Sequence, residues 1–338
     1  MTSVNTFLSR LSSWKQSTIS SHLCLDLRPS AAYQTRQLVP STNIPWQQLS
    51  SRCAELPPKN VPFALVQPAG QPEECSTWLQ EHGWQCPWVF QEEELYEENN
   101  EEWQRAQERG WVGNTPPQKQ WLLFQPCPFL AKHMATIESQ LARRGDDAWH
   151  CLDIGCGSGR DVAWILSHSP RWRVSAYDSL KGAVDRTFKL AENMNVADRL
   201  NVTQAKVMAD GAWKTFDEET EKRVLLQEQT KKERFAPGIP ASQFLGEAKY
   251  DLVLTIRFLV RPLLLYLPSL LNKGGFLVIS HFVDDGVHEY SQPRKDHRLQ
   301  LHELRQLYGG MEDVEILVDT IEEIEDGRPV NSFILKKL

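Results

Sequence analysis

The chain of 338 residues lacks an apolar run long enough to cross a membrane. Its most apolar stretch, residues 258–271, is interrupted by an arginine and two prolines, whereas a spanning helix needs about 18 consecutive apolar residues. The N-terminus also lacks the apolar core of a secretory signal peptide. We therefore expect neither membrane insertion nor secretion.

Paired metal-binding cysteines are also missing. The seven cysteines are odd in number, none forms a C-x-x-C pair, and no histidine cluster completes a zinc site. This pattern is typical of free thiols in a reducing compartment, so we expect a cytoplasmic protein without a bound metal. A mitochondrial location is the alternative, because residues 1–25 contain no acidic side chain and are rich in serine, as in a transit peptide.

An excess of positive charge is absent as well. Lysine and arginine number 37 against 44 aspartates and glutamates, which gives a net charge of −7. This balance disfavours a nucleic-acid partner, because nucleic acids are bound largely through basic side chains on their phosphates. Hydrophobic residues make up 41% of the chain, enough to bury ordinary cores, and the length suits two domains.

Composition changes near residue 91. Residues 91–102 contain seven glutamates, and a Pro-Pro pair follows. An acidic stretch followed by a proline break is typical of a domain boundary. We predict a first domain over residues 1–112, a linker over 113–124 and a second domain over 125–338.

Both domains are predicted to be α/β. Strands and helices alternate in each, which indicates parallel sheets. The second domain ends in two strands around Asp326-Gly327, a favoured hairpin turn. We predict a small parallel sheet, then a doubly wound, Rossmann-like sheet with a C-terminal antiparallel hairpin. A charged insertion over residues 213–249 interrupts the second domain and is a candidate lid. The expected strands are 23–27, 62–66 and 87–90, then 150–154, 172–177, 200–208, 250–255, 276–282, 314–322 and 330–336; the expected helices of the second domain are 129–143, 160–167, 180–193, 263–271 and 302–308.

The strongest local pattern is a glycine-rich turn after the first strand of the second domain. Residues 153–159 read D-I-G-C-G-S-G and lead from a buried strand into a helix. Glycine lets the backbone turn sharply and approach a ligand closely, and amides at the helix start point into such a site. Asp178 ends the next strand, where a carboxylate can accept hydrogen bonds from both ribose hydroxyls.

The spacing of the glycines selects among nucleotides. A dinucleotide-binding turn reads G-x-G-x-x-G, but Arg160 stands where the third glycine belongs, which disfavours a nicotinamide oxidoreductase. Asp153 precedes the turn and would repel a pyrophosphate, yet it suits a cationic amino group. An adenosine with an amino-acid arm and no phosphate meets both conditions, and S-adenosylmethionine is such a ligand.

With these features, residues 125–338 resemble the class I S-adenosylmethionine-dependent methyltransferases. The segments G-S-G-R-D and E-D-G-R-P-V are most similar to the tellurite-resistance-type subgroup. The resemblance implies an S-adenosylmethionine cofactor whose methionine part is held by Asp153 and the turn, whose ribose is held by Asp178 and whose adenine amino group is held by Asp210. The predicted cofactor-binding residues are Asp153, Gly155, Cys156, Gly157, Gly159, Asp178, Asp210 and Thr255.

Residues 17–92 resemble rhodanese-like domains through the segments D-L-R-P and N-I-P. In active members a cysteine follows the central strand, in a loop whose amides stabilise its thiolate. Here Gln67 occupies that position and two prolines remove loop amides. We interpret this domain as a non-catalytic binding or docking module with a protein partner. A sulfurtransferase that uses Cys75 or Cys86 is the disfavoured alternative.

The residues that contact the methyl acceptor are less marked. Arg257 is a candidate for binding an anionic acceptor, and a surface ion pair is its alternative role. His281 is a candidate general base, or a strand-end histidine without chemistry. No Asn-Pro-Pro-Tyr-like or Asp-Pro-Pro-Tyr-like segment follows residues 250–255, which disfavours DNA amines and glutamine amides as acceptors. The subgroup resemblance implies a small nucleophile, such as a thiol or a chalcogen oxyanion; a protein acceptor stays open, as does a cofactor-binding scaffold or sensor without turnover.

Overall fold

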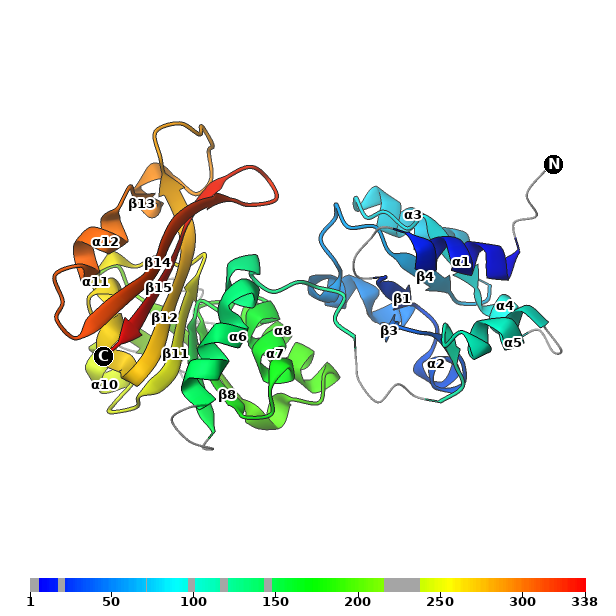
Figure 1. The fold of residues 1–338 in the computed structure, drawn as a ribbon, viewed down its shortest axis with the longest axis horizontal. Helices are drawn as coiled ribbons and strands as arrows, with labels where there is room; N and C mark the ends of the chain where they lie inside the picture. The colour runs from blue at the N-terminus through cyan, green and yellow to red at the C-terminus, as the bar shows by residue number, and fades with distance from the viewer. Residues whose placement is uncertain are drawn as a thin grey trace, which may run out of the picture. The chain divides into compact units, whose positions relative to one another are not determined.

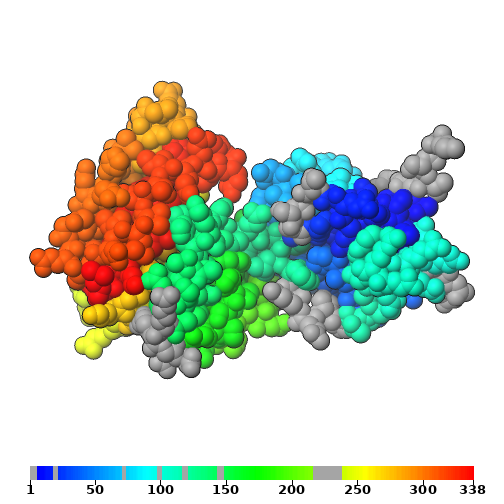
Figure 2. All heavy atoms as spheres, viewed as in Figure 1, coloured from blue at the N-terminus to red at the C-terminus, as the bar shows by residue number. Residues whose placement is uncertain are grey.

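A computed structural model describes residues 6–17, 22–70, 72–96, 101–115, 121–142, 148–215 and 238–338. The chain divides into two compact units, residues 1–125 and 126–338, which run from blue to green and from green to red in Figures 1 and 2. Each unit has its own sheet and its own buried apolar clusters. Most of the charged insertion, residues 216–237, lies outside the described residues.

The first unit is built on a parallel sheet with the strand order β3-β1-β4-β5. Its middle strands β1 and β4 are buried along their whole length, which is why they read as short, mostly apolar runs that each end in a polar residue. The two-residue strands β2, β3 and β6 give no such pattern. The elements are α1 Phe7–Gln16, β1 Cys24–Asp26, α2 Ser30–Thr35, β2 Gln37–Leu38, β3 Thr42–Asn43, η1 Trp46–Glu55, β4 Ala64–Gln67, α3 Pro72–Glu81, β5 Trp88–Gln91, α4 Glu92–Tyr96, α5 Glu101–Glu108 and β6 Val112–Gly113.

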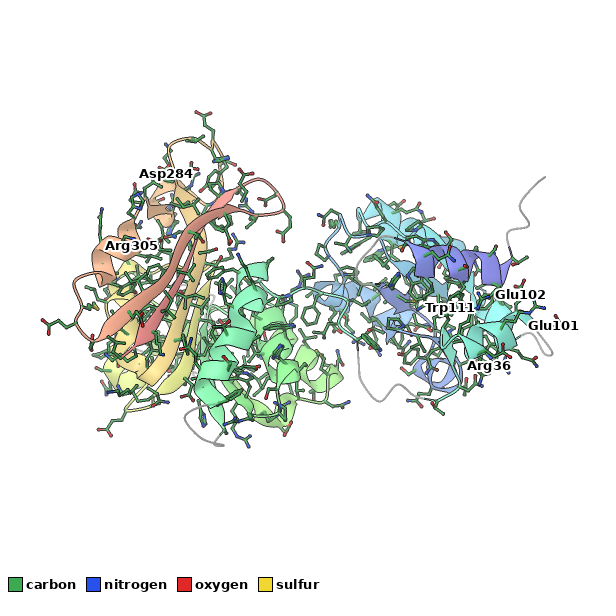
Figure 3. The ribbon with its side chains drawn as sticks, in the orientation of Figure 1. Arg36, Glu101, Glu102, Trp111, Asp284 and Arg305 are labelled. Carbon is green, nitrogen blue, oxygen red and sulfur yellow. The ribbon has the colours of Figure 1, made fainter. Side chains whose placement is uncertain are left out.

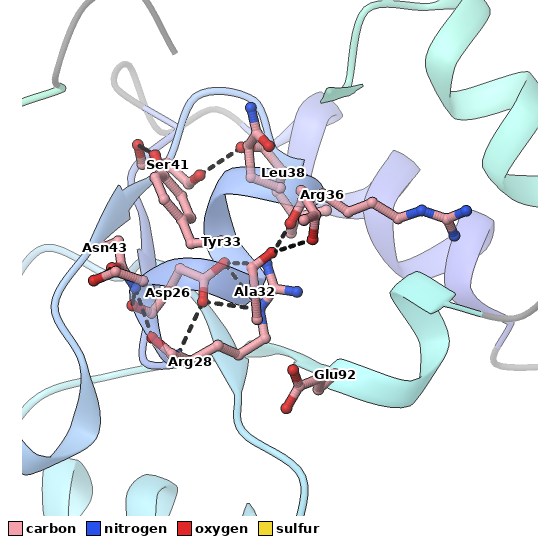
Figure 4. A network of polar contacts seen from close by, with 12 residues as sticks. Asp26, Arg28, Ala32, Tyr33, Arg36, Leu38, Ser41, Asn43 and Glu92 are labelled. Carbon is pink, nitrogen blue, oxygen red and sulfur yellow. Dashed lines mark hydrogen bonds and ion pairs between the residues drawn. The ribbon is translucent and has the colours of Figure 1, made fainter. Parts of the chain in front are cut away.

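A buried ion pair fixes the end of β1 (Figure 4). Nη2 of Arg28 lies 2.7 Å from Oδ2 of Asp26, and both side chains are 0% exposed. The side-chain amide of Asn43 donates through Nδ2 to the backbone carbonyl oxygens of Asp26 and Arg28 at 2.9 and 2.8 Å, which links β1 to β3. The pair therefore organises the edge from which the loops of this unit leave the sheet.

The second unit contains a doubly wound sheet with the order β10-β9-β8-β7-β11-β12-β15-β14, and β13 pairs with β12. Neighbouring strands from β9 to β12 run parallel. β15 pairs antiparallel with both β12 and β14. This confirms the predicted Rossmann-like order and the terminal hairpin. The elements are α6 Pro128–Ala142, β7 Trp149–Ile154, α7 Arg160–His168, β8 Trp172–Asp178, α8 Lys181–Asn193, η2 Ala197–Arg199, β9 Leu200–Val207, β10 Trp213–Thr215, α10 Ala241–Phe244, β11 Tyr250–Ile256, α11 Arg261–Leu264, η4 Leu267–Leu270, β12 Leu271–Asp284, η5 Lys295–His297, β13 Leu299–Gln300, α12 Glu303–Tyr308, β14 Val314–Glu323 and β15 Pro329–Lys337.

Both faces of this sheet are covered by helices. Leu252 and Leu254 of β11 pack into the apolar cluster that includes residues of α6 and α7. Val253, between them, packs into the opposite cluster with residues of α11 and α12, because successive strand residues point to opposite faces. On that side Arg305 of α12, labelled in Figure 3, donates through Nε to Oδ2 of Asp319 in β14 at 2.7 Å and holds the helix on the hairpin.

The prediction was wrong for one helix and incomplete at the start of the insertion. The single helix expected over 263–271 is instead α11 and η4, and β12 already begins at Leu271. Pro268 causes the break, because proline is not accommodated in the interior of a helix, whereas Pro262 lies in the first turn of α11, where proline fits. The start of the insertion is part of the core: Trp213 is 0% exposed and stacks on Phe244 with ring centroids 4.6 Å apart.

Candidate functional site

The glycine-rich turn is fastened to the end of the neighbouring strand. The backbone amides of Gly155 and Cys156 both donate to the carbonyl oxygen of Tyr177, at 2.8 and 3.1 Å. The amide of Gly159 donates to the carbonyl oxygen of Cys156 at 2.9 Å. Three backbone amides of the turn, at residues 155, 156 and 159, are therefore hydrogen-bonded within the protein.

Asp178 ties the tip of the turn to β8. Its Oδ2 accepts a hydrogen bond from the amide of Gly157 at 2.9 Å, and its Oδ1 accepts one from the amide of Leu180 at 2.9 Å. A pyrophosphate site at such a turn needs free amides that point at the phosphates. Here the amides of Gly155, Cys156 and Gly157 already have acceptors, so these three are not available to a phosphate.

Two glycines of the turn are required by close contacts and by a left-handed backbone. At Gly155, with φ +83°, a Cβ would lie 2.7 Å from the ring of Phe258. At Gly159, with φ +77°, a Cβ would lie 2.7 Å from side-chain atoms of Thr187 and 2.8 Å from its Cα. Gly159 therefore lets α7 start close against α8, whereas Gly157, with φ +58°, faces open space. Of the three, Gly157 is the one that leaves room for a ligand.

The floor of the turn is acidic and buried. Asp153 is 3% exposed, and burial raises the pKa of its carboxyl well above the ordinary value, with Asp161 and Asp178 adding repulsion. Burial also raises the pKa of Asp161, whose Oδ1 accepts a hydrogen bond from the amide of Cys127 at 2.6 Å. Because a buried charge is costly unless it is paired, this floor favours a ligand that brings a positive group.

The other predicted cofactor residues lie around the same sheet edge. Cys156 is in the turn; burial is the main cause that raises the pKa of its thiol, and Asp153 adds to it. Asp210 is exposed in the turn between β9 and β10, where its Oδ1 accepts from the amide of Ala212 at 3.0 Å. Thr255 is 2% exposed at the end of β11, and its hydroxyl has no hydrogen-bond partner among the described residues.

Arg257 lines a cavity of about 440 Å³ at the carboxyl end of the sheet. It has a left-handed backbone, with φ +59°, and its amide donates to the carbonyl oxygen of Ser280 at 2.8 Å. Its guanidinium carbon lies 4.8 Å from the ring centroid of Phe282. The cavity is bounded by the start of α6, by the ends of β12 and β15 and by the hairpin, and its lining residues are Cys127, Pro128, Phe129, Lys132, Arg257, Ser280, Glu322, Glu323, Ile324, Glu325, Val330 and Ser332.

His281 does not belong to this cavity lining. It follows Ser280 on β12 and therefore points to the opposite face of the sheet. The side chain is 4% exposed, and burial lowers its pKa to about 4. Its Nε2 lies 2.9 Å from the carbonyl oxygen of His297, which requires a proton on Nε2. Arg257 and His281, the two residues predicted to contact the methyl acceptor, thus lie in different surroundings.

Sequence patterns gave no sign of most of the cavity. Ser280 and Ser332 are small polar residues in β12 and β15, and only the register of these strands brings them opposite each other. The glutamates of the hairpin, Glu322, Glu323 and Glu325, read as an ordinary solvated edge. The one usable signal was Arg257, directly after a buried strand.

In the first unit, the loop after β4 is in contact with the carboxylate of Glu92. Gln67 is 1% exposed, and its Oε1 accepts from Nε2 of Gln91 at 3.0 Å. The amide of Ala69 donates to Oε2 of Glu92 at 2.8 Å, so a carboxylate already occupies part of the loop. Burial raises the pKa of Cys75 to about 11 and that of Cys86 to about 12. Both thiols therefore stay protonated at neutral pH.

Among the described residues, no group of three or more His, Cys, Asp or Glu side chains is placed to hold a metal ion. Within the same residues, the helices are too short or too polar to cross a membrane.

Comparison with known proteins gives one relative at high similarity. The chain is 34% identical over 336 residues to "Uncharacterized protein UNK4.09" of Schizosaccharomyces pombe, and the alignment covers 93% of each protein. No family model matches the chain.

Solved structures resemble it only distantly. TehB from Haemophilus influenzae gives a TM-score of 0.38 with 16% identity and covers 62% of this chain and 66% of that one. A SAM-dependent methyltransferase from Aquifex aeolicus gives a TM-score of 0.36 with 11% identity and covers 59% and 88%. A putative sarcosine dimethylglycine methyltransferase from Galdieria sulphuraria gives 0.40 with 14% identity and covers 61% and 86%. At these scores the similarity assigns no activity, which has to be argued from the site.

Proposed function

This chain belongs to one family with the fission yeast protein UNK4.09, and we propose that it is an S-adenosylmethionine-dependent methyltransferase. The observation that carries the proposal is the turn after β7. Its amides at residues 155–157 are bound by Tyr177 and Asp178, which leaves fewer hydrogen-bond donors for a pyrophosphate. Beneath it lies the buried carboxyl of Asp153, which suits the cationic amino group of a methionine arm.

The residues of the site divide the cofactor among them in this proposal. Asp153 and the backbone around Gly157 hold the methionine part, Asp178 receives the ribose hydroxyls, and Asp210 receives the adenine amino group. Thr255 contributes its hydroxyl at the end of β11, which has no hydrogen-bond partner among the residues that the structure describes. The cofactor supplies an electrophilic methyl group on a sulfonium; the protein supplies alignment and exclusion of water.

Little acid–base chemistry is needed from the chain if the acceptor is already a nucleophile. The pKa of the Cys156 thiol is raised by burial, and the imidazole of His281 is neutral, buried and outside the cavity. We therefore assign the rate enhancement to positioning of a small-molecule acceptor in the cavity beside Arg257. A volume of about 440 Å³ suits a small molecule.

For the first unit we propose a rhodanese-like docking module without sulfur-transfer activity. Glutamine at position 67 cannot carry sulfane sulfur, and Glu92 places a negative charge where a persulfide anion would need hydrogen-bond donors. The most direct check is thiocyanate formation from thiosulfate and cyanide by the full chain. We expect none; activity that disappears in Cys75→Ser or Cys86→Ser would establish the sulfurtransferase instead.

The decisive experiment on the second unit is a calorimetric titration with S-adenosylmethionine and, in parallel, with NAD and ADP-ribose. We expect saturable binding of S-adenosylmethionine and no binding of the pyrophosphate compounds. The opposite preference would remove the proposal and leave only the fold. Turnover is then tested by the release of S-adenosylhomocysteine with thiols, oxyanions and a metabolite extract. If S-adenosylmethionine binds but no tested acceptor leads to release of S-adenosylhomocysteine, the chain is a cofactor-binding sensor.

A further inference from the structure

Two residues that line the cavity beside Arg257 each carry a buried polar atom that has no hydrogen-bond partner within the described part of the chain. Nη1 of Arg257 and Oγ of Ser332 are both buried, and neither has a hydrogen-bond partner among the described residues. Ser280 lies directly opposite Ser332 in the β12–β15 register and is 1% exposed. Buried polar groups are almost always paired, so this end of the cavity is built to receive oxygen atoms from a ligand.

The backbone and the guanidinium of Arg257 are both held by neighbouring residues. Its left-handed backbone, unusual for a residue other than glycine, is anchored by the hydrogen bond from its amide to the carbonyl oxygen of Ser280. The ring of Phe282 packs against one side of the guanidinium. Strained conformations of this kind persist where the surrounding structure fixes them, and they concentrate at binding sites.

The charge at the mouth of the cavity limits what can enter. Glu322, Glu323 and Glu325 line it, and Lys132 forms an ion pair with Glu322 at 3.7 Å. Glu325 is exposed at the hairpin turn. The lining carries three carboxylates against two cations, so a multiply charged oxyanion would be repelled on entry. A ligand with one negative group at the deep end and a neutral or cationic group toward the mouth fits this distribution.

We propose that the cavity binds a small organic monocarboxylate, with its carboxylate on Nη1 of Arg257 and the hydroxyl of Ser332. The planar guanidinium suits a planar carboxylate, and about 440 Å³ falls within the roughly 300–1,000 Å³ of small-molecule sites. An inorganic chalcogen oxyanion would leave most of that space empty. That this carboxylate is the methyl acceptor rests on the proposed function; that it binds here does not.

The test uses the full chain and matched pairs of compounds, each a small acid and its own primary amide. The first pair is 3-mercaptopropionate with 3-mercaptopropionamide, followed by the acid and amide of glycine and of benzoic acid. Binding is measured by calorimetry and by saturation-transfer NMR, with and without S-adenosylhomocysteine. We expect at least one acid to bind about tenfold more tightly than its amide, because hydrogen bonds to charged groups are the stronger ones.

Variants assign the preference to the proposed atoms. Arg257→Gln should abolish it, Arg257→Lys should retain part of it, and Ser332→Ala should weaken acid binding several-fold while the amide is unaffected. Arg173→Gln is the matched control, since Arg173 is exposed on β8 and does not line the cavity. Unfolding temperatures establish that each variant is folded.

Equal binding of acid and amide in every pair, no binding of any acid at about 10 mM, or an unchanged preference in Arg257→Gln would each overturn the assignment. A parallel titration with S-adenosylmethionine separates the two proposals. If the acid preference is found without cofactor binding, the cavity assignment stands and the methyltransferase proposal fails. If the cofactor binds without any acid preference, the reverse holds.

Discussion

The carboxylate of Asp178 accepts a hydrogen bond from the amide of Gly157 across the gap between two neighbouring strand ends, at 2.9 Å. Its second oxygen accepts from the amide of Leu180 at the start of α8. One side chain thus sets the position of the glycine turn and the entry of the next helix. Asp178 therefore acts on the turn, in addition to the ribose contact that we propose for it.

The first prediction concerns cofactor affinity. Asp178→Lys should abolish measurable S-adenosylmethionine binding in calorimetry, because it removes the acceptor for Gly157 and reverses the charge at the site. Asp178→Asn keeps one oxygen acceptor and should weaken binding about tenfold or more. Asp185→Lys on the exposed face of α8 is the control, since Asp185 forms a surface pair with Lys181. Wild-type affinity in both Asp178 variants would refute the role of this residue.

The second prediction concerns the turn glycines. Gly159→Ala should lower the free energy of unfolding by about 2–4 kcal/mol, as the sum of a left-handed alanine and a Cβ clash with Thr187. Gly327 has a similar φ of +78°, but a Cβ at this position would meet nothing within 4 Å, so Gly327→Ala should cost only about 1 kcal/mol. Denaturant unfolding measures both. Equal losses would mean that the contact with Thr187 is relieved at no cost.

The third prediction concerns acid stability. Burial lowers the pKa of His281 from 6.5 to about 4, with Arg257, Arg261 and His297 adding repulsion. Between these values the unfolded chain binds a proton that the folded chain does not, so this residue makes stability fall as the pH falls. The loss should approach about 3 kcal/mol near pH 4. His281→Gln should flatten the pH dependence of unfolding in this window, whereas His150→Gln, at an exposed site on β7, should leave it unchanged. A profile that keeps its slope in His281→Gln would contradict the assignment.

The fourth prediction concerns the buried pair of the first unit. Arg28→Ala should destabilise by about 3–5 kcal/mol, because it leaves the carboxylate of Asp26 buried without its partner. The double variant Asp26→Leu with Arg28→Met should lose much less, since both charges are then removed. Arg105→Ala is the surface comparison: Arg105 pairs with Glu101 at side-chain exposures of 58% and 80%, and its loss should cost under about 1 kcal/mol. A small effect of Arg28→Ala would show that water reaches this pair.

Local patterns were sufficient for the architecture. The alternation of apolar runs and helical periods gave the Rossmann-like order, and D-I-G-C-G-S-G with Asp178 marked where the turn and its acidic partner lie. These features could be predicted because strand and helix periodicity and glycine turns depend on residues close in sequence. The prediction of one helix over 263–271 was wrong at Pro268, which lies in a 3₁₀ helix instead.

The order of the elements and the residues of the turn could therefore be predicted from local patterns alone. The tertiary structure adds that Ser280 lies opposite Ser332, that Arg257 lines the same cavity, and that Glu92 accepts a hydrogen bond from the amide of Ala69. The physical reason is that sheet register and loop packing join residues far apart along the chain. Their proximity is fixed by the packing of whole strands and helices, which no short segment of sequence specifies.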